Sequence, residues 1–354
     1  MEIKVTTAET NRTRPKDSDL GFGQVFTDHM FVMDYSEEKG WHDPAIVPYA
    51  DFSISPAAMV FHYGQAIFEG LKAYKTPDKK ICLFRPRDNF KRMNRSAKGM
   101  CIPQIDIEVV MDALKQLIKL EEKWIPETLG TSLYIRPTII ATDPFLGVRA
   151  SFTYKFFIIL SSVGAYYAGG LNPVKIWVSK DHVRAVKGGV GEFKTAGNYA
   201  ASLIASEKAK KDGYAQVLWL DANERKYIEE VGAMNIFFLL EDELVTPNLT
   251  GTILPGITRY SVISLAKKWG MNISERKISI DEVFKAHENG KLKEVFGSGT
   301  AAVISPVGEI RYGDKVISIG DGTPGETAMK FYNALTDIQY GKAKDSENWI
   351  EVID

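Results

Sequence analysis

The longest apolar runs in this chain have the length of a β-strand. "FFIIL" and "NIFFLL" are examples, and both are far shorter than the roughly 20 residues that a membrane helix requires. Other stretches, such as "IEVVMDALKQLIKLEEKW", place apolar residues at helical spacing. Strands and helices are therefore interspersed along the chain, and the sequence contains no internal repeat. This pattern predicts an α/β (α+β) protein.

A length of 354 residues and an apolar content of 45% predict two domains, because one domain usually contains about 100–200 residues. The segment "GAYYAGGLNP", residues 164–173, is rich in glycine, ends in proline and lies between two strand-like runs. We therefore expect an N-terminal domain over residues 1–163, a linker over 164–173 and a C-terminal domain over 174–354.

Local patterns predict elements in both halves. From His62 we expect a short helix in "HYGQAIFEGL", a strand pair joined by "TPDKK", and a helix in "RPRDNFKRMNRSAKGM". In the second half we expect a helix over 198–211 and helices in "PGITRYSVISLAKKWG" and "GETAMKFYNALTDIQYG". The predicted strands include "TSLYIRPTIIAT", "SFTYKFFIILSSV", "VKIWVSK", "AQVLWL", "KYIEEV" and "MNIFFLL".

Charge and composition narrow the class of partner. The 44 basic and 45 acidic residues nearly cancel, and without a long basic run nothing favours nucleic acid or an anionic membrane. Five scattered histidines and the two cysteines, Cys82 and Cys101, show no metal-ligand spacing. The polar opening "MEIKVTTAETNRTRPKDSD" lacks the apolar core of a signal peptide. We expect a cytoplasmic protein that acts on a small molecule.

Lys194 lies among small and aromatic residues, in "GVGEFKTAGNYAAS", just before a predicted helix. One interpretation is a loop lysine that extends into solvent. A second is a phosphate-binding loop, since "GGVGEFKT" nearly matches G-x-x-x-x-G-K-[ST]. However, Phe193 replaces the glycine before the lysine and leaves the backbone no room to wrap a phosphate chain. The third is a Schiff-base lysine, which needs a partly dry pocket and neighbours that steer proton transfer.

A pyridoxal phosphate enzyme also needs an acid at the ring nitrogen. The predicted strand "KYIEEV" ends in Glu229 and Glu230. Because strand residues alternate between faces, only one of these carboxylates can point at the ring, and we expect the other to be solvated.

The sequence offers candidates for the remaining cofactor contacts. "GTILPGITR" precedes a helix whose first N–H groups, at Ile257 and Thr258, favour a phosphate dianion. The loop "GSGTAA", residues 297–302, allows close approach of the backbone to a ligand. Tyr199 could reach the ring oxygen. Each also has an ordinary interpretation, as a capped helix start, a tight turn or a packed tyrosine.

Taken together, these motifs resemble the branched-chain amino acid aminotransferases. "FKTAGNYAAS", "QVLWLD", "EVGAMNIFF", "TPNLTGTILPGITR" and "FGSGTAA" occur in the family's order, and "GFGQVFTDHMF", "HYGQAIFEGLKAY", "RPRDNFKRMNRSA" and "SLYIRP" extend the resemblance over nearly the whole chain. It implies a fold-type IV pyridoxal phosphate enzyme with a small N-terminal α/β domain and a larger C-terminal pseudo-barrel domain. It also implies a homodimer with active sites at the domain interface.

The resemblance implies specific roles for the cofactor residues. Lys194 would be the catalytic residue and form the Schiff base, Tyr199 would bind the ring oxygen, and Glu230 rather than Glu229 would pair with the ring nitrogen. The implied phosphate cup consists of Arg92, Ile257, Thr258 and Thr300. From the sequence alone, Arg92 would be assigned to a surface helix.

A substrate pocket follows from the same resemblance. Thr300 and Ala301 would hold the substrate α-carboxylate, and Arg136 would face the γ-carboxylate of glutamate. The side-chain pocket would contain Phe22, Tyr63, Phe68, Tyr134 and Val148. Without the family these aromatics would be assigned to the core.

The chain departs from the family at two places. Many members have "EVGTMN", where this chain has Ala233, so a threonine contact to the substrate carboxylate must be replaced by backbone or water. Some mammalian members carry a Cys-x-x-Cys redox pair where this chain has Ala302 and Ser305, which excludes a thiol switch there.

The implied reaction moves the amino group of leucine, isoleucine or valine reversibly to 2-oxoglutarate, giving the 2-oxo acid and glutamate in ping-pong fashion. The nearest alternatives are a D-amino acid aminotransferase and an aminodeoxychorismate lyase of the same fold. A cofactor-binding protein without turnover is the alternative from another class. The sequence ranks none of the three amino acids above the others.

Overall fold

The computed structural model describes residues 1–9, 12–164 and 170–353. The chain divides into two compact units: the first contains Met1–Tyr166, Phe193–Ala196 and Asp337–Asp354, and the second contains Tyr167–Glu192 and Gly197–Thr336. The centre of the predicted linker, residues 165–169, lies outside the described residues. Both the C-terminal tail and the short segment around Lys194, which the sequence analysis placed in the second domain, belong to the first unit.

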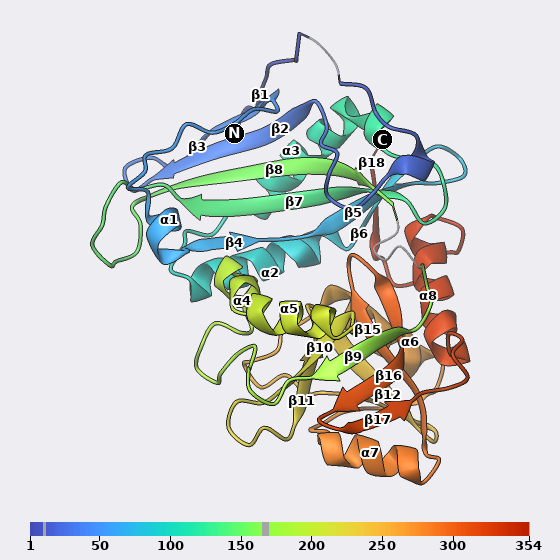
Figure 1. The fold of residues 1–354 in the computed structure, drawn as a ribbon. Helices are drawn as coiled ribbons and strands as arrows, with labels where there is room; N and C mark the ends of the chain where they lie inside the picture. Colours follow the sequence, from blue (N-terminus) through green and yellow to red (C-terminus); the bar gives the residue numbers. More distant parts are fainter. Residues whose placement is uncertain (10–11, 165–169, 354) are drawn as a thin grey trace. The chain divides into compact units, whose positions relative to one another are not determined.

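The first unit is built on a mainly antiparallel sheet, in which nine strands are seen among the described residues (Figure 1). The order is β1-β3-β2-β8-β7-β5-β6-β18, and β4 pairs with β7. Burial along β7 alternates from residue to residue, as expected for a strand with one face in the core. The strands are β1 (Lys4–Val5), β2 (His29–Ser36), β3 (Gly40–Pro48), β4 (Ala66–Phe68), β5 (Leu71–Lys75), β6 (Ile81–Phe84), β7 (Ser132–Ala141), β8 (Thr153–Val163) and β18 (Ile350–Ile353).

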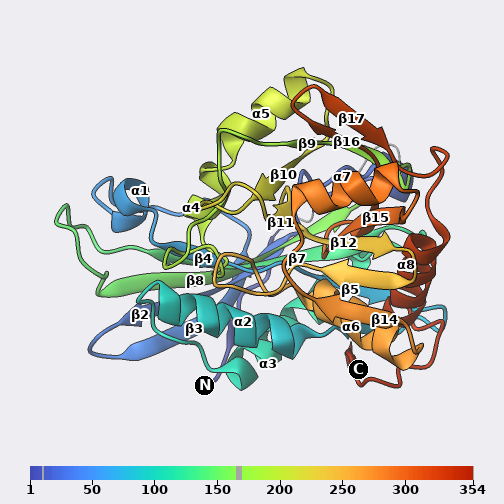
Figure 2. The same cartoon turned by 90° about the horizontal axis from the view of Figure 1, so that it is seen from below.

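Helices α2 (Pro86–Gly99) and α3 (Ile107–Leu120) lie side by side along this sheet (Figure 2). Asp106 caps α3 by accepting the N–H groups of Glu108 and Val109. The apolar residues of both helices join the strands in one core that contains Phe90, Leu114 and Phe156 among others. Two short 3-10 helices, Asp17–Asp19 and Glu122–Trp124, complete the unit.

The prediction of a short helix from His62 is wrong beyond Tyr63. Helix α1 (Met59–Tyr63) ends at Gly64, whose φ of 60° is left-handed, and the chain then forms β4. The tertiary pairing of β4 with β7 outweighs the local helical pattern.

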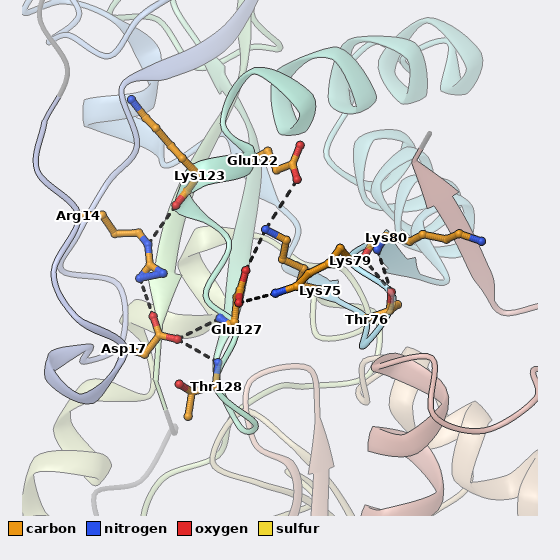
Figure 3. Close-up of polar contacts among 10 residues, drawn as sticks. All are labelled: Arg14, Asp17, Lys75, Thr76, Lys79, Lys80, Glu122, Lys123, Glu127 and Thr128. Atoms are coloured by element: carbon orange, nitrogen blue, oxygen red, sulfur yellow. Dashed lines mark hydrogen bonds and ion pairs between the residues drawn. The ribbon is translucent and has the colours of Figure 1, made fainter.

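An N-terminal polar cluster ties distant parts of this unit together (Figure 3). The Asp17 carboxylate accepts the N–H groups of Glu127 and Thr128 at 3.0 and 2.9 Å and contacts the Arg14 guanidinium at 2.5 Å. The neighbouring Glu127 carboxylate pairs with Lys75 at 3.1 Å and with Lys79 at 2.8 Å. The segment after Trp124 is thereby fixed to the N-terminal region.

The second unit contains a curved sheet in the order β11-β10-β9-β16-β15-β12-β13-β14, with β17 on β16. β12 follows β11 after a tight turn in which Val231 and Met234 form a bridge, so the path returns to its start and closes a pseudo-barrel. The strands are β9 (Val174–Val178), β10 (Gln216–Leu220), β11 (Ile228–Val231), β12 (Asn235–Leu240), β13 (Glu243–Thr246), β14 (Asn272–Glu275), β15 (Leu292–Gly299), β16 (Val303–Tyr312) and β17 (Lys315–Ser318).

The helices after Lys194 differ from the prediction at one point. The helix expected over 198–211 is two helices, α4 (Ala196–Ala200) and α5 (Leu203–Lys211). Ser202 donates from both its N–H and its hydroxyl to the Tyr199 carbonyl, at 3.1 and 2.7 Å. This tight turn interrupts the helix. The other helices are α6 (Ile257–Lys268), α7 (Ile280–Glu288) and α8 (Glu326–Gln339), and α8 runs across the boundary between the units.

Candidate active site

The backbone of Lys194 is held inside the first unit by α2 and β4. Its N–H donates to the Ser96 hydroxyl at 2.9 Å, and its carbonyl accepts from Phe68 N–H at 3.0 Å. The Thr195 hydroxyl donates to the Ala66 carbonyl at 2.8 Å. Lys194 therefore lies at the edge of a sheet and is not in a free loop.

Small residues of α2 make room for this segment. A Cβ at Gly99 would lie only 2.3 Å from the Phe193 ring, a distance that no side chain tolerates. The glycine that ends α2 is thus required for the residue before Lys194 to pack. The small and aromatic residues around Lys194 thus allow its backbone to pack against α2.

The Lys194 ammonium lies 4.7 Å from the centre of the Phe68 ring. The Arg136 guanidinium also lies 4.7 Å from that ring centre, and 5.2 Å from the Tyr134 ring. Phe68 therefore contacts both the candidate catalytic lysine and the candidate carboxylate-binding arginine, each in a cation–π arrangement.

Four of the predicted pocket residues come together here. The rings of Phe22 and Tyr134 meet edge to face at 5.0 Å, and Arg136 Nη2 donates to the Tyr134 hydroxyl at 2.9 Å. Tyr134 lies over Gly70, where a Cβ would be 2.1 Å from the phenol oxygen. Arg136 Nε is buried without a hydrogen-bond partner among the described residues. A buried guanidinium N–H of this kind is suited to a ligand carboxylate.

Tyr63 and Val148 occupy a different part of the first unit. The Tyr63 hydroxyl donates to the carbonyl of Leu146, in the loop that also carries Val148. Val148 is 85% exposed. A side chain this exposed does not line a closed pocket within its own chain.

Arg92 is buried, so the expectation of a surface helix position is wrong for this residue. Its Nε and Nη2 donate to the two carboxylate oxygens of Glu69, at 2.7 and 2.8 Å, and Glu69 is fully buried. A guanidinium carries five N–H donors, so the pair with Glu69 does not exhaust the donors of Arg92, although Glu69 offsets its charge.

Glu230 and Glu229 on β11 are both buried, with 3% and 5% exposure. The expectation that one of them is solvated is wrong. Glu230 contacts Arg184 Nε at 2.6 Å and accepts from Asn235 Nδ2 at 3.1 Å. Glu229 accepts from the Thr252 hydroxyl at 2.5 Å. Burial raises the pKa of Glu229, and the Thr252 hydrogen bond and the Arg184 charge offset this only in part.

The N-terminus of α6 is open to an anion. Its N-cap is Gly256, and no side chain caps the first turn. Ile257 and Thr258 are buried at this end, so their N–H groups and the helix dipole favour a negatively charged group. A Cβ at Gly256 would lie 2.0 Å from Asn235 Oδ1, so Asn235 contacts both the helix start and Glu230.

Thr300 and Ala301 lie in the turn between β15 and β16, half-buried. Val303, directly after this turn, has a φ of 61°, a conformation that a β-branched residue adopts only under strain. Such strain is common at ligand-binding turns. Tyr199 is half-buried in α4 and Ala233 is exposed.

Sequence reasoning missed Arg184 and Asn235. Arg184 pairs with Glu230 and donates from Nη2 to the carbonyls of Gly191, at 2.9 Å, and of Thr252. Arg184 lies in none of the family motifs, and Asn235, although it lies within "EVGAMNIFF", has no role assigned from the sequence, so only the tertiary structure reveals their contacts. Arg184 links Glu230 to the segment that leads to Lys194.

Each unit holds groups of the kind that pyridoxal phosphate requires: the second has an uncapped helix start and a buried carboxylate, and the first has a lysine held by its backbone. The described part of the chain holds no group of three or more His, Cys, Asp or Glu residues that could bind a metal ion. Its helices also include none long and apolar enough to span a membrane.

Residues 66–310 match the family model described as amino-transferase class IV. The chain belongs to the class IV aminotransferases. This class IV enzyme is 58% identical to branched-chain-amino-acid aminotransferase 2 of Bacillus subtilis (strain 168), over 98% of this chain and 96% of that protein. It is 55% identical to the probable branched-chain-amino-acid aminotransferase of Staphylococcus aureus (strain N315), over 99% and 98%.

Solved structures resemble this class IV enzyme in the same way. The branched-chain amino acid aminotransferase of Escherichia coli superposes with a TM-score of 0.77 at 28% identity, covering 92% of this chain and 99% of that one. The T.th. branched-chain amino acid aminotransferase in complex with N-(5'-phosphopyridoxyl)-L-glutamate gives 0.76 at 26% identity, covering 94% and 100%. The predicted family, fold class, transaminase activity and pyridoxal phosphate dependence are confirmed.

Proposed function

We propose that this class IV enzyme exchanges the amino group between leucine, isoleucine or valine and 2-oxoglutarate. In this proposal Lys194 acts as nucleophile and general acid/base, and Arg136 binds the γ-carboxylate of glutamate. The observation that carries this proposal is the Phe68 ring, which contacts both the Lys194 ammonium and the Arg136 guanidinium at 4.7 Å. The Phe68 ring thus contacts both the Lys194 amine, the proposed nucleophile, and the Arg136 guanidinium, the proposed carboxylate-binding cation. A transaminase for apolar amino acids and glutamate needs both.

Bound pyridoxal phosphate supplies an electron sink for the carbanion at the substrate Cα. Lys194 would anchor the cofactor, and once released its amine would take the substrate Cα proton and deliver it to the C4′ carbon of the cofactor. Its backbone bonds to Ser96 and Phe68 keep the amine in place while the side chain moves. The lysine is therefore both nucleophile and general acid/base.

In this proposal the second unit supplies most of the polar contacts to the cofactor, and the first unit supplies Arg92. Glu230 holds the ring-nitrogen proton, and Arg184 Nε lies 2.6 Å from its carboxylate. Tyr199 donates to the ring oxygen. Backbone N–H groups of Ile257, Thr258 and Thr300, together with Arg92, hold the phosphate, and the turn at Thr300 and Ala301 holds the substrate α-carboxylate.

Substrate choice rests on Phe22, Phe68, Tyr134 and Arg136. The three rings offer an apolar surface for a branched side chain. When glutamate enters, the unpartnered Nε of Arg136 donates to its γ-carboxylate. One pocket then accepts both kinds of substrate because the guanidinium stays stacked on Phe68 when no carboxylate is present.

A homodimer in the cytoplasm completes the proposal. Several apolar side chains of the first unit are exposed in α1 and in the loop between β7 and β8: Phe61 (62%), Tyr63 (39%), Phe145 (42%), Leu146 (63%) and Val148 (85%). An apolar patch of this kind is typical of a subunit interface. If a second copy of the chain binds this patch, Tyr63 and Val148 of one copy would lie against the substrate pocket of the other.

Half-reaction spectra test this function. The visible absorbance of the bound cofactor should be lost on adding leucine, isoleucine, valine or glutamate and restored by 2-oxoglutarate, whereas D-alanine should leave it unchanged. Loss of absorbance with D-alanine but not leucine would favour a D-amino acid aminotransferase. Pyruvate release from aminodeoxychorismate would favour the lyase.

A further inference from the structure

The second unit contains a cavity of about 180 Å³ on the side of β11 away from Glu230. Glu229 lines it, and strand alternation turns Glu229 and Glu230 to opposite faces. None of the predicted cofactor or substrate residues lines this cavity. A cavity of about 150 Å³ holds a molecule as large as benzene, so a small organic ligand fits.

Glu229, which lines the cavity, has one carboxylate oxygen that is not used within the described residues. The Thr250 and Thr252 hydroxyls lie 3.0 Å apart, and Thr252 donates to Glu229 Oε1 at 2.5 Å. Glu229 Oε2 is buried and has no hydrogen-bond partner among the described residues. A buried carboxylate oxygen without a donor is costly. A ligand that brings an N–H group would remove this cost.

The exposed part of the cavity lining carries two lysines and one carboxylate, that of Glu224. Lys187 and Lys277 line the cavity and are exposed, and the Lys277 ammonium lies 4.3 Å from the centre of the Tyr227 ring. Neither lysine has a carboxylate partner within the described ranges. Two unpaired ammonium groups at one opening favour an anionic group on the ligand.

Besides Glu229, two carboxylates line the cavity, Asp221 and the exposed Glu224. Asp221 accepts the N–H groups of Asn223, Glu224, Lys226 and Tyr227 at 2.8 to 3.2 Å, so its oxygens are occupied by the turn that it stabilises. The described residues form no metal-binding group here. A ligand with a donor at one end and an anion at the other therefore fits best.

We propose that this cavity is a second site for a free α-amino acid in its zwitterionic form. The α-ammonium group donates to Glu229 Oε2, and the α-carboxylate faces Lys187 and Lys277. This site is separate from the reacting groups and does not depend on the roles assigned to Lys194 or Arg136.

The test uses the holoenzyme with its cofactor in the amine form, which cannot condense with an added amino acid. Binding of labelled L-leucine is measured by equilibrium dialysis for the wild type, for Glu229→Leu, which removes the inner acceptor, and for Lys187→Ala at the exposed opening. In the wild type we expect a binding component of about one leucine per chain. Each of the two substitutions should raise the dissociation constant of this component at least about tenfold, because each removes one charge-assisted contact. Glu207→Leu and Lys210→Ala, exposed on α5, are the matched controls and should bind like the wild type.

Two analogues test the zwitterion directly. Leucine methyl ester lacks the carboxylate and 4-methylpentanoate lacks the ammonium, and both should lose the component that depends on Glu229. The proposal is overturned if leucine binding is the same in all folded variants, or if 4-methylpentanoate occupies the Glu229-dependent component as tightly as leucine. If Glu229→Leu fails to fold, Lys187→Ala still tests the proposal, because Lys187 is an exposed residue of the cavity lining.

Discussion

Arg92 and Glu69 form a bidentate ion pair inside the first unit, with Nε–Oε1 and Nη2–Oε2 distances of 2.7 and 2.8 Å. Arg92 is therefore both a structural partner and the proposed cation of the phosphate cup. The two roles make different predictions.

Arg92→Ala should weaken cofactor affinity about ten- to a hundredfold, the value of a charge-assisted contact of about 1.5–3 kcal/mol. It should also lower the free energy of unfolding by about 3–5 kcal/mol, because Glu69 is left buried without a partner. Arg92→Lys should recover only part of the affinity, since an ammonium lacks the planar fork. Cofactor dissociation constants and denaturant unfolding measure the two effects.

The double variant Arg92→Ala/Glu69→Gln separates the two roles. It removes the uncompensated carboxylate, so most of the stability should return while cofactor affinity stays low. If affinity returned along with stability, Arg92 would have only a structural role.

Glu230→Gln should lower the turnover rate strongly at saturating cofactor, because an amide cannot hold the ring-nitrogen proton. Glu229→Gln should be mild by comparison, since Glu229 faces the other side of β11. Single-turnover rates with leucine compare the two. A larger loss in Glu229→Gln would reverse the proposed facing of the strand.

Arg136→Gln should lower kcat/KM for glutamate by about ten- to a hundredfold, through loss of a charge-assisted contact of about 1.5–3 kcal/mol. The value for leucine should change much less, because the Phe22 and Tyr134 rings remain. Arg87→Gln, at a partly exposed position on α2, is the control. Equal losses for both substrates would assign Arg136 a structural role instead.

Asp17 should make the stability of the first unit pH-dependent. Burial raises its pKa, but hydrogen bonds from Thr128 and Glu127 and the Arg14 charge outweigh burial, and the net pKa is lowered. A lowered pKa in the folded state gives stability that is present above the unfolded value of about 3.9 and lost as the pH falls through the folded value.

Asp17→Asn should therefore cost about 1.5–3 kcal/mol near pH 7, and the difference from wild type should shrink at acidic pH. Urea unfolding at pH 7 and pH 3 measures it. Asp19→Asn, exposed in the same 3-10 helix, should have little effect. A difference between wild type and Asp17→Asn that stays constant with pH would contradict the assignment.

Periodicity predicted the elements with a clear pattern and failed where tertiary contacts decide. Burial alternates along most of β7 and along the first part of β8, and the sequence predicts both as strands. By contrast, β4 forms because β7 pairs with it, and the break between α4 and α5 depends on Ser202 bonding to Tyr199. Neither contact is visible in a local pattern.

Some features of the candidate site could be predicted from the sequence, and others depend on tertiary contacts. Lys194 could be singled out from its small and aromatic neighbours, and the resemblance supplied roles for the others. Burial of Arg92 with Glu69, and of both Glu229 and Glu230, could not be predicted, because a charged residue on an amphipathic helix or strand is usually solvated. Arg184 and Asn235 depend on contacts between segments far apart in the chain.

Chemical trapping tests the central claim most directly, because it identifies the lysine that carries the cofactor. The holoenzyme is reduced with borohydride and digested, and the peptide that bears the phosphopyridoxyl group is found by mass spectrometry. Lys72 is the strongest competitor, since burial lowers its pKa to about 8, a property of Schiff-base lysines. We expect the label on Lys194 and no label in Lys194→Ala. A label on Lys72, or one that persists in Lys194→Ala, would contradict it.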